Sequence, residues 1–415
     1  MNAGTIQQPL HLSYCMNVHP GESGEDVLAG LRTGAAEVKR RLGRSGGFGV
    51  GLRLGAAAVR DLSCPEGMER LKSALAEEDL YAFTVNGFPY GSFHGVRVKE
   101  GVYAPDWRTE ERLDYTLALA RMMVELVPSG LEPSISTVPV SYGGWIRDEE
   151  DRLALVGRLA TCAVELHRLE LETGTTVRVG LEPEPGCVLE TTDEVIAFFE
   201  EQLFREGSRV IEEGWGLKRY GAEAVLRRHL GVCLDTCHVA LAHEDPLAVT
   251  KRLGQHGIGV VKVQVSAALE VADGTKAKEL LQTWDEPVYL HQVRGIRPDG
   301  SRGMWSDLPD YLADAGGPLK QVRVHFHVPL TWAGEGELWS TVSTMGEEWF
   351  DWLKTGDCPH VETETYTYSV LPEALRGESV AGMIAGELEW ALGRITRASP
   401  KTLTAKPGFA ELDPC

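Results

Sequence analysis

Acidic side chains and a histidine stand at the ends of separate strand-like runs of this sequence. Glu182 ends one run, Asp235 ends a second, and Glu364 lies at the end of a third near the C-terminus. His238 follows Asp235 by three residues, so its imidazole can turn back over the same place. Hard carboxylate oxygens, joined by a histidine or an amide, suit Mn²⁺, Mg²⁺ or Zn²⁺. The pattern predicts a divalent metal ion bound by these carboxylates, with Gln264 supplying a neutral oxygen.

A simpler interpretation exists for the Asp235-Thr-Cys-His238 segment taken alone. Asp235 can cap a helix while His238 lies on the surface, and a single Asp-x-x-His sequence is common. Two further acidic strand ends change the balance, because titratable groups that converge in one place are typical of functional sites. We therefore favour a metal or catalytic centre.

The residues expected to act in catalysis are Glu182, Glu364 and His238. A metal-polarised carbonyl or hydroxyl beside a carboxylate permits proton transfer at the adjacent carbon, which gives isomerisation or epimerisation. Glu184 and Glu362 have the same strand parity as these glutamates. One member of each pair can bind the metal while the other acts as the base, and the sequence does not assign them.

Two further histidines, His325 and His327, share one face of a strand-like run. His327 is a predicted metal ligand, and the pair can form a second metal position or hold a substrate oxyanion. An equally good alternative is a buried, hydrogen-bonded pair without a ligand, since histidine makes structural contacts as readily as it binds metal.

The expected substrate-binding residues are His238, His325, Lys262, Arg53 and Trp332. Lys262 and Arg53 have inward parity and can bind a phosphate or carboxylate, although neutralising an interior glutamate is the slightly better interpretation. Trp332 begins a tryptophan-rich stretch that predicts either an aromatic lid over a bulky ligand or ordinary helix packing.

Two periodicities indicate how these side chains are positioned. Strand-like runs alternate, so that the valines from 261 to 265 oppose Lys262, Gln264 and Ser266. Stretches with helical spacing, such as 108–127 and 148–171, separate most of these runs. Strands that alternate with helices predict parallel pairing. We expect an α/β fold, a TIM (β/α)8 barrel with its site at the carboxyl ends of the strands.

The length of 415 residues fits one elaborated barrel domain at 1–398. An inserted hairpin and lid is expected at about 286–334, before the last strand, because a turn around 298–300 interrupts the repeat. Residues 399–415 are expected to form an irregular tail.

Composition narrows the partners and the compartment. The net charge of −20 repels phosphate backbones, so broad nucleic-acid binding is disfavoured and a small-molecule metabolite is the expected partner. No apolar run approaches the roughly 18 residues that span a bilayer, and the N-terminus lacks an export-signal pattern. The eight cysteines form no paired CxxC motif, which argues against a disulfide scaffold. We expect a cytoplasmic protein with reduced thiols.

Three segments carry a resemblance to a known superfamily: GLEPEPG at 180–186, GVCLDTCH at 231–238 and VETETYT at 361–367. They resemble the xylose isomerase-like barrels, which include sugar isomerases, epimerases and endonuclease IV. The resemblance covers most of the chain. It implies a divalent metal held at the barrel mouth by acidic residues and a histidine from successive strands.

Residue by residue, the resemblance implies acidic ligands at Glu182, Asp235 and Glu364. His238 matches a histidine that contacts substrate or a second metal in different branches. Gln264 departs from the usual histidine, and because an amide binds a divalent cation more weakly than imidazole, it implies altered chemistry or lost turnover.

A finer resemblance lies in VHFHVPL at 324–330 and SYCMNVHPGE at 13–22. These segments look most like the EboE-type branch, which is named for metabolite traffic. That branch implies prenyltransferase-like and membrane partners, the Ebo-type proteins, in precursor handling or export.

Three functions follow from these observations. The first is a metal-dependent isomerase or epimerase that processes a small metabolite. The second is a catalytically degenerate module that binds a metabolite for a partner, favoured by Gln264 and the tryptophan-rich stretch. The third is an endonuclease IV-like phosphodiesterase, which the acidic surface disfavours.

Overall fold

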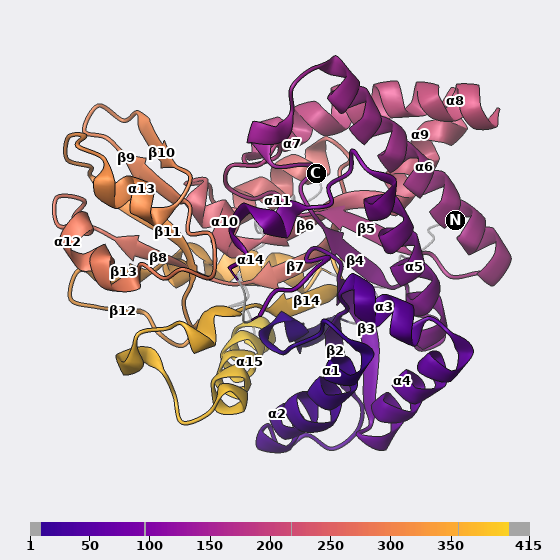
Figure 1. Cartoon of the computed structure of the whole chain (residues 1–415), viewed down its shortest axis with the longest axis horizontal. Coiled ribbons are helices and arrows are strands. Elements are labelled where there is room, and N and C mark those ends of the chain that lie inside the picture. Colours follow the sequence, from indigo (N-terminus) through magenta and orange to yellow (C-terminus); the bar gives the residue numbers. More distant parts are fainter. Residues whose placement is uncertain (1–9, 95–96, 217, 356, 398–415) are drawn as a thin grey trace, which may run out of the picture.

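Eight parallel strands form the central sheet, and helices surround it (Figure 1). The computed structural model describes residues 10–94, 97–216, 218–355 and 357–397, so the predicted tail at 399–415 lies outside the described residues. The strands are β1 (His11–Tyr14), β2 (Phe48–Arg53), β3 (Leu80–Asn86), β4 (Ser134–Thr137), β5 (Arg178–Leu181), β6 (Leu230–Asp235), β7 (Val260–Val265) and β14 (His360–Thr363).

The spatial order of the strands is β1-β14-β7-β6-β5-β4-β3-β2. Each neighbouring pair is parallel, and a parallel bridge between Cys15 and Gly51 joins the two ends of the row. The sheet therefore closes on itself, and the predicted TIM barrel is confirmed.

Helices follow most of the barrel strands and cover the outer face of the sheet (Figure 1). They are α1 (Gly24–Ala29), α2 (Ala36–Arg41), α3 (Ala56–Leu62), α4 (Pro65–Glu77), α5 (Glu110–Leu126), α6 (Glu149–Thr173), α7 (Thr192–Ala197), α8 (Ser208–Trp215), α9 (Arg219–His229), α10 (Thr236–Leu241), α11 (Pro246–Gln255), α14 (Glu347–Leu353) and α15 (Val380–Thr396). The π-helical segments η2 (Gly30–Ala35) and η5 (Phe198–Gly207) join α1 to α2 and α7 to α8.

Helix α6 shows why such segments form where they do. Asp148 caps its first turn by accepting a hydrogen bond from the amide of Asp151, and Gly174 ends it in the left-handed region with φ of 74°. Its buried residues Leu155 and Leu159 are one turn apart and face the barrel, whereas Leu153 is exposed.

The interior of the barrel is polar as well as apolar, because each strand sends alternate side chains inward. Lys262 on β7 forms an ion pair of 2.5 Å with Glu362 on β14, and both side chains are fully buried. A Cβ at Gly51 on β2 would lie 1.1 Å from Glu362 Oε1. Glycine is therefore required at residue 51 to leave room for this ion pair.

A second sheet of six strands interrupts the barrel between β7 and β14, and Figure 1 shows it in orange at one side of the barrel. Its strands are β8 (Ala268–Val271), β9 (Val293–Ile296), β10 (Arg302–Trp305), β11 (Gln321–His327), β12 (Gly334–Glu335) and β13 (Leu338–Ser340). They pair antiparallel in the order β10-β9-β11-β8-β13-β12, and the helices α12 (Ala277–Leu281) and α13 (Leu308–Ala313) accompany them.

The insertion was expected before the last barrel strand, and it lies there. Its predicted form and bounds need correction, because a six-stranded sheet that begins at Ala268 replaces a hairpin confined to about 286–334. β11, which carries His325 and His327, belongs to this second sheet rather than to the barrel. Within the described ranges, none of the helices is long and apolar enough to cross a membrane.

Candidate metal centre and pocket

Three buried carboxylates meet at the carboxyl ends of the barrel strands. Asp235 is the last residue of β6, Glu182 directly follows β5, and Glu364 directly follows β14. One oxygen from each of the three lies within 4.8 Å of the others. The structure thus brings together the three acidic residues that the sequence placed at strand ends, in a group that we call the carboxylate cluster.

The two carboxylate oxygens of Asp235 have different surroundings. Its Oδ1 accepts hydrogen bonds from the amides of Cys237 (2.7 Å) and His238 (3.2 Å) and from the hydroxyl of Ser266 (2.5 Å), so it caps α10. Its Oδ2 has no hydrogen-bond partner among the described residues. The helix cap was the alternative interpretation of Asp235 in the sequence; Oδ1 has that role, and the role of Oδ2 as a metal ligand stays a prediction.

The carboxylate cluster is electrostatically unfavourable without a cation. Burial, and then the charge of Asp235, raise the pKa of Glu182 well above its usual range. Burial, and then the charges of Glu182 and Asp235, raise the pKa of Glu364 in the same way. Burial alone would also raise the pKa of Asp235, but His238 and His327 bring it below its usual value. Glu182 Oε2 has no hydrogen-bond partner in the described chain. These unpaired oxygens fit a divalent cation.

Three neutral histidines border the cluster: His238 on α10, and His325 and His327 on β11. Burial lowers the pKa of all three, to about 4 for His238. His327 Nδ1 donates to the main-chain oxygen of Glu364 at 2.8 Å, so its Nε2 carries the lone pair, and no described residue occupies it. Atoms of Asp235, His238 and His327 also approach within 4.8 Å of one another, which offers a second position for a cation.

A residue that the sequence did not reveal, Gln292, orients the second histidine. It precedes β9, and its amide nitrogen donates to the main-chain oxygen of Pro185 (3.0 Å) and to the Tyr103 hydroxyl (2.9 Å). Its oxygen, 2.6 Å from His325 Nδ1, then accepts from that nitrogen. His325 Nε2 therefore carries a lone pair and faces His238 Nε2 at 3.1 Å.

Tyr103 is the second residue that sequence reasoning missed, and it contacts Glu184. Its hydroxyl donates to Glu184 Oε1 at 2.7 Å. Burial raises the pKa of Glu184 to about 8, although this hydrogen bond acts in the opposite direction. Tyr103 lies in a short helical turn, η3 (Lys99–Tyr103), far from any strand end, so neither periodicity nor motif spacing marked it.

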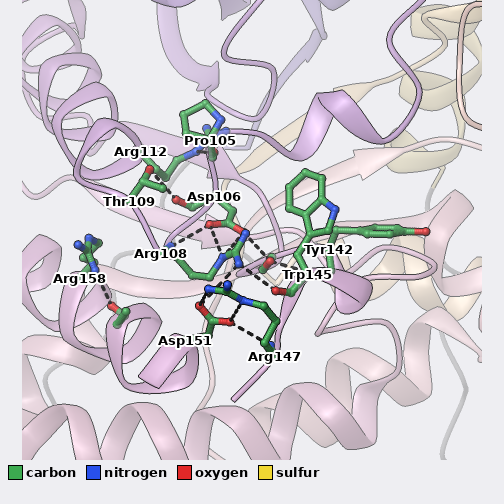
Figure 2. A network of polar contacts seen from close by, with 12 residues as sticks. Pro105, Asp106, Arg108, Thr109, Arg112, Tyr142, Trp145, Arg147, Asp151 and Arg158 are labelled. Carbon is green, nitrogen blue, oxygen red and sulfur yellow. Dashed lines mark hydrogen bonds and ion pairs between the residues drawn. The ribbon is translucent and has the colours of Figure 1, made fainter. Parts of the chain in front are cut away.

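A polar network holds the loop behind Tyr103 in place (Figure 2). The Arg108 guanidinium bonds to the Asp106 carboxylate at 2.9 Å and to the main-chain oxygen of Trp145 at 2.9 Å. The ring of Tyr142 in the same loop stacks on Tyr103, with centroids 5.3 Å apart and an interplanar angle of 19°. The network therefore fixes the ring whose hydroxyl reaches the site.

Gln264 lies beside the carboxylate cluster but does not present its oxygen to it. Its amide oxygen accepts from the Cys233 thiol at 2.6 Å, and its amide nitrogen donates to Glu364 Oε2. In this arrangement Gln264 holds Glu364 in place, and its role as a metal ligand stays a prediction.

Two residues of the cluster, Glu182 and Glu364, line a pocket of about 540 Å³, a volume that includes its open end. Glu182, Glu364 and the three histidines form its floor, together with Glu184. The walls come from the segment between β3 and α5 and from the insertion, which contributes Tyr289 and Leu290. The insertion thus supplies both histidines of β11 and part of the wall.

Three predicted substrate-binding residues lie outside this pocket. Lys262 is paired with Glu362 beneath the floor, as described above, and Arg53 pairs with Glu22 at 2.8 Å. Both thus neutralise a glutamate, which is the interpretation that the sequence slightly favoured over substrate binding. Trp332 packs near Trp284, with ring centroids 6.3 Å apart, and lines no part of the pocket. His238 and His325 do line it.

No protein-family model matches the sequence, and no curated protein matches it. Among solved structures, the chain is similar to a xylose isomerase domain protein from Alicyclobacillus acidocaldarius, at 15% identity over 92% of this chain and 99% of that chain, with a TM-score of 0.45. It is also similar to the IOLI protein with a bound zinc atom, at 10% identity over 93% and 99% of the two chains, with a TM-score of 0.47.

An AP endonuclease of family 2 from Brucella melitensis is a further structural neighbour, at 12% identity over 62% of this chain and 79% of that chain, with a TM-score of 0.35. The resemblance to the EboE-type branch stays a prediction.

Proposed function

We propose that this chain is a divalent-metal-dependent isomerase or epimerase of a small metabolite. The observation that carries the proposal is the buried carboxylate cluster, two residues of which line a pocket beside three neutral histidines. Like charges buried this closely destabilise the folded state unless a cation or protons neutralise them. Such an arrangement is therefore more typical of a binding site than of a structural core.

Glu182, Asp235 and Glu364 would hold the cation, with His327 Nε2 available beside them. Mixed carboxylate and imidazole donors suit Mn²⁺ or Zn²⁺, whereas an all-oxygen shell suits Mg²⁺. A cation bound there would supply Lewis-acid polarisation of a substrate carbonyl or hydroxyl.

Glu184 is the residue that we assign as the base. Its pKa of about 8 leaves it able to exchange a proton near neutral pH, and Tyr103 orients the carboxylate. Glu184 takes a proton from the carbon next to the carbonyl as that C–H bond breaks. Isomerisation is completed when Glu184 returns the proton to the former carbonyl carbon while the proton of the neighbouring hydroxyl passes to the former carbonyl oxygen, so that carbonyl and hydroxyl exchange places. Epimerisation needs a second acid on the opposite face of the same carbon, which gives its proton to that carbon while Glu184 keeps the one that it removed.

This assignment divides each glutamate pair that the sequence left open. Glu182 and Glu364 serve as ligands, Glu184 is the base, and Glu362 is the counterion of Lys262. The predicted catalytic roles of Glu182 and Glu364 are therefore replaced by ligand roles in this proposal. His238 keeps its place on the pocket floor, where it can donate to or accept from a substrate oxygen.

A second candidate is a metabolite-binding or traffic module of the EboE type, working with Ebo-type partners. Gln264 favours it, because its amide nitrogen already bonds to Glu364 and its oxygen bonds to Cys233. Such a protein would retain the pocket and bind a metabolite without turnover.

Metal content of the purified, untagged protein separates the two candidates. We expect stoichiometric Mn or Zn by elemental mass spectrometry in the wild type, and its loss in Asp235→Ala. Since Asp235 also caps α10, Glu182→Gln provides a variant without a lost cap, and circular dichroism checks the fold of both. A wild type without metal, or variants with wild-type metal content, would contradict the metal centre and favour the binding module.

A further inference from the structure

The pocket has two chemically different halves. Its floor carries the carboxylates and histidines, whereas its walls are apolar and aromatic: Phe88, Phe93, Val102, Tyr289, Leu290 and Tyr366. A substrate that fills the pocket therefore meets polar groups at one end and apolar groups along its body.

Three of the wall residues form a mutual ring contact that we call the aromatic triad: Phe93, Tyr289 and Tyr366. Their ring centroids are 5.3 Å apart for Phe93 and Tyr289, 5.4 Å for Phe93 and Tyr366, and 5.0 Å for Tyr289 and Tyr366. Tyr366 also contacts the ring of His327 at 4.7 Å, so the triad begins at the edge of the floor. Such a surface binds rings or alkyl chains next to the polar site.

Positive charge for an anionic substrate is missing from the walls. Among the described residues that line the pocket, Lys99 is the only lysine or arginine, and it pairs with Asp307 at 2.6 Å. Arg53 lies behind Phe93 at 5.8 Å from its ring, and its guanidinium is paired with Glu22. Each of these cationic side chains is thus already paired with a carboxylate, so neither offers an uncompensated positive charge to a phosphate on the substrate.

We propose that the substrate is a neutral, amphipathic molecule, an inference that rests on the proposed function of the same site. Its polar end carries adjacent oxygen atoms that reach the floor, where proton transfer takes place. Its body is an uncharged ring or alkyl group that lies against the aromatic triad. A phosphorylated sugar is the class that this pocket excludes.

Three probes that differ at one carbon test the proposal: D-glucose, D-glucose 6-phosphate and 6-O-benzyl-D-glucose, each titrated into the metal-loaded protein by NMR. Burial of a phenyl-sized apolar surface predicts that the benzyl ether binds at least about tenfold more tightly than glucose. The phosphate is expected to bind more weakly than glucose. Tighter binding of the phosphate than of the benzyl ether, or no binding of any probe, would overturn the proposal.

Variants locate the effect. Tyr289→Ala should reduce the advantage of the benzyl ether over glucose to less than about threefold. Phe93→Leu keeps most of the buried volume and should reduce the advantage in the same direction, which guards against misfolding of the first variant. Trp339→Ala, at an exposed tryptophan of the same insertion, is the matched control and should leave the advantage intact. An unchanged advantage in Tyr289→Ala and Phe93→Leu contradicts the role of the triad.

Metal content of the same samples separates this inference from the proposed function. A protein that holds metal but shows no benzyl advantage refutes the substrate class and leaves the metal centre standing. A protein that lacks metal but keeps the advantage refutes the metal centre, while the apolar half of the pocket is upheld.

Discussion

Replacement of Glu182 by Gln isolates the electrostatic cost of the carboxylate cluster. Gln keeps the size of the side chain and removes its charge. Glu182 is buried, its Oε2 has no hydrogen-bond partner among the described residues, and burial beside Asp235 raises its pKa well above the usual range. In metal-free protein the substitution should therefore leave the melting temperature unchanged or raise it, because one buried acidic group is relieved.

The opposite holds when metal is present. A ligand at one hundred times its Kd stabilises the folded state by about 2.7 kcal/mol. Unfolding entropy of about 2.1 cal/mol/K per residue, over 415 residues, gives about 0.9 kcal/mol/K. Saturating metal should thus raise the Tm of the wild type by about 3 °C. Glu182→Gln loses a ligand, so this increase should shrink to less than about 1 °C at the same metal concentration.

Differential scanning calorimetry in EDTA and in saturating Mn²⁺ or Zn²⁺ measures both effects. Glu172→Gln is the matched control, since Glu172 is an exposed glutamate on α6 and the same charge is removed. The control should keep the wild-type metal shift. An increase of about 3 °C that survives in Glu182→Gln, or a metal-free variant that melts several degrees lower, would refute the account of the cluster.

Two further predictions concern buried charge away from the cluster. Lys262→Met leaves Glu362 buried without its cation and should lower the free energy of unfolding in urea by about 3–5 kcal/mol. The double variant Lys262→Met/Glu362→Gln should recover part of this loss. Unchanged stability with weakened ligand binding would support a substrate role for Lys262 instead. Burial raises the pKa of Glu387 on α15 from its ordinary 4.5 to about 7. Between these two values the folded state binds more protons than the unfolded state, so stability falls as pH rises through that window. Glu387→Gln should remove about 3 kcal/mol of this decline, measured as the difference between the two unfolding curves from pH 4 to pH 8, and parallel curves would contradict it.

The barrel and its carboxylate cluster could be predicted because both follow from periodicity. Alternation fixes which side chains of a strand face inward, and parallel strands bring their carboxyl ends to one mouth. Parity does not by itself assign depth. Glu362 is in register with Gln264 and lies two residues before Glu364, and two residues of strand span about 6.6 Å, so Glu362 and its partner Lys262 lie below the floor to which Glu364 belongs.

The rest of the site comes from segments without a period. Tyr103 ends the short helical turn η3, Tyr289 lies in a loop, and Gln292 lies just before a strand of the insertion. Their positions depend on contacts across the molecule, such as the hydrogen bond from the Val98 amide to the Val288 oxygen at 2.9 Å. The insertion was underestimated because its strands are short, and β11 has the same alternation as a barrel strand.

The position of the insertion has a consequence for synthesis of the chain on the ribosome. β14 pairs with both β7 and β1, but it follows the entire second sheet in the chain. While the insertion emerges, β7 and β1 are the free edges of an unfinished sheet, and such edges pair readily with other chains. The segment that supplies histidines to the finished site thus also governs how long the nascent barrel stays open to misassembly.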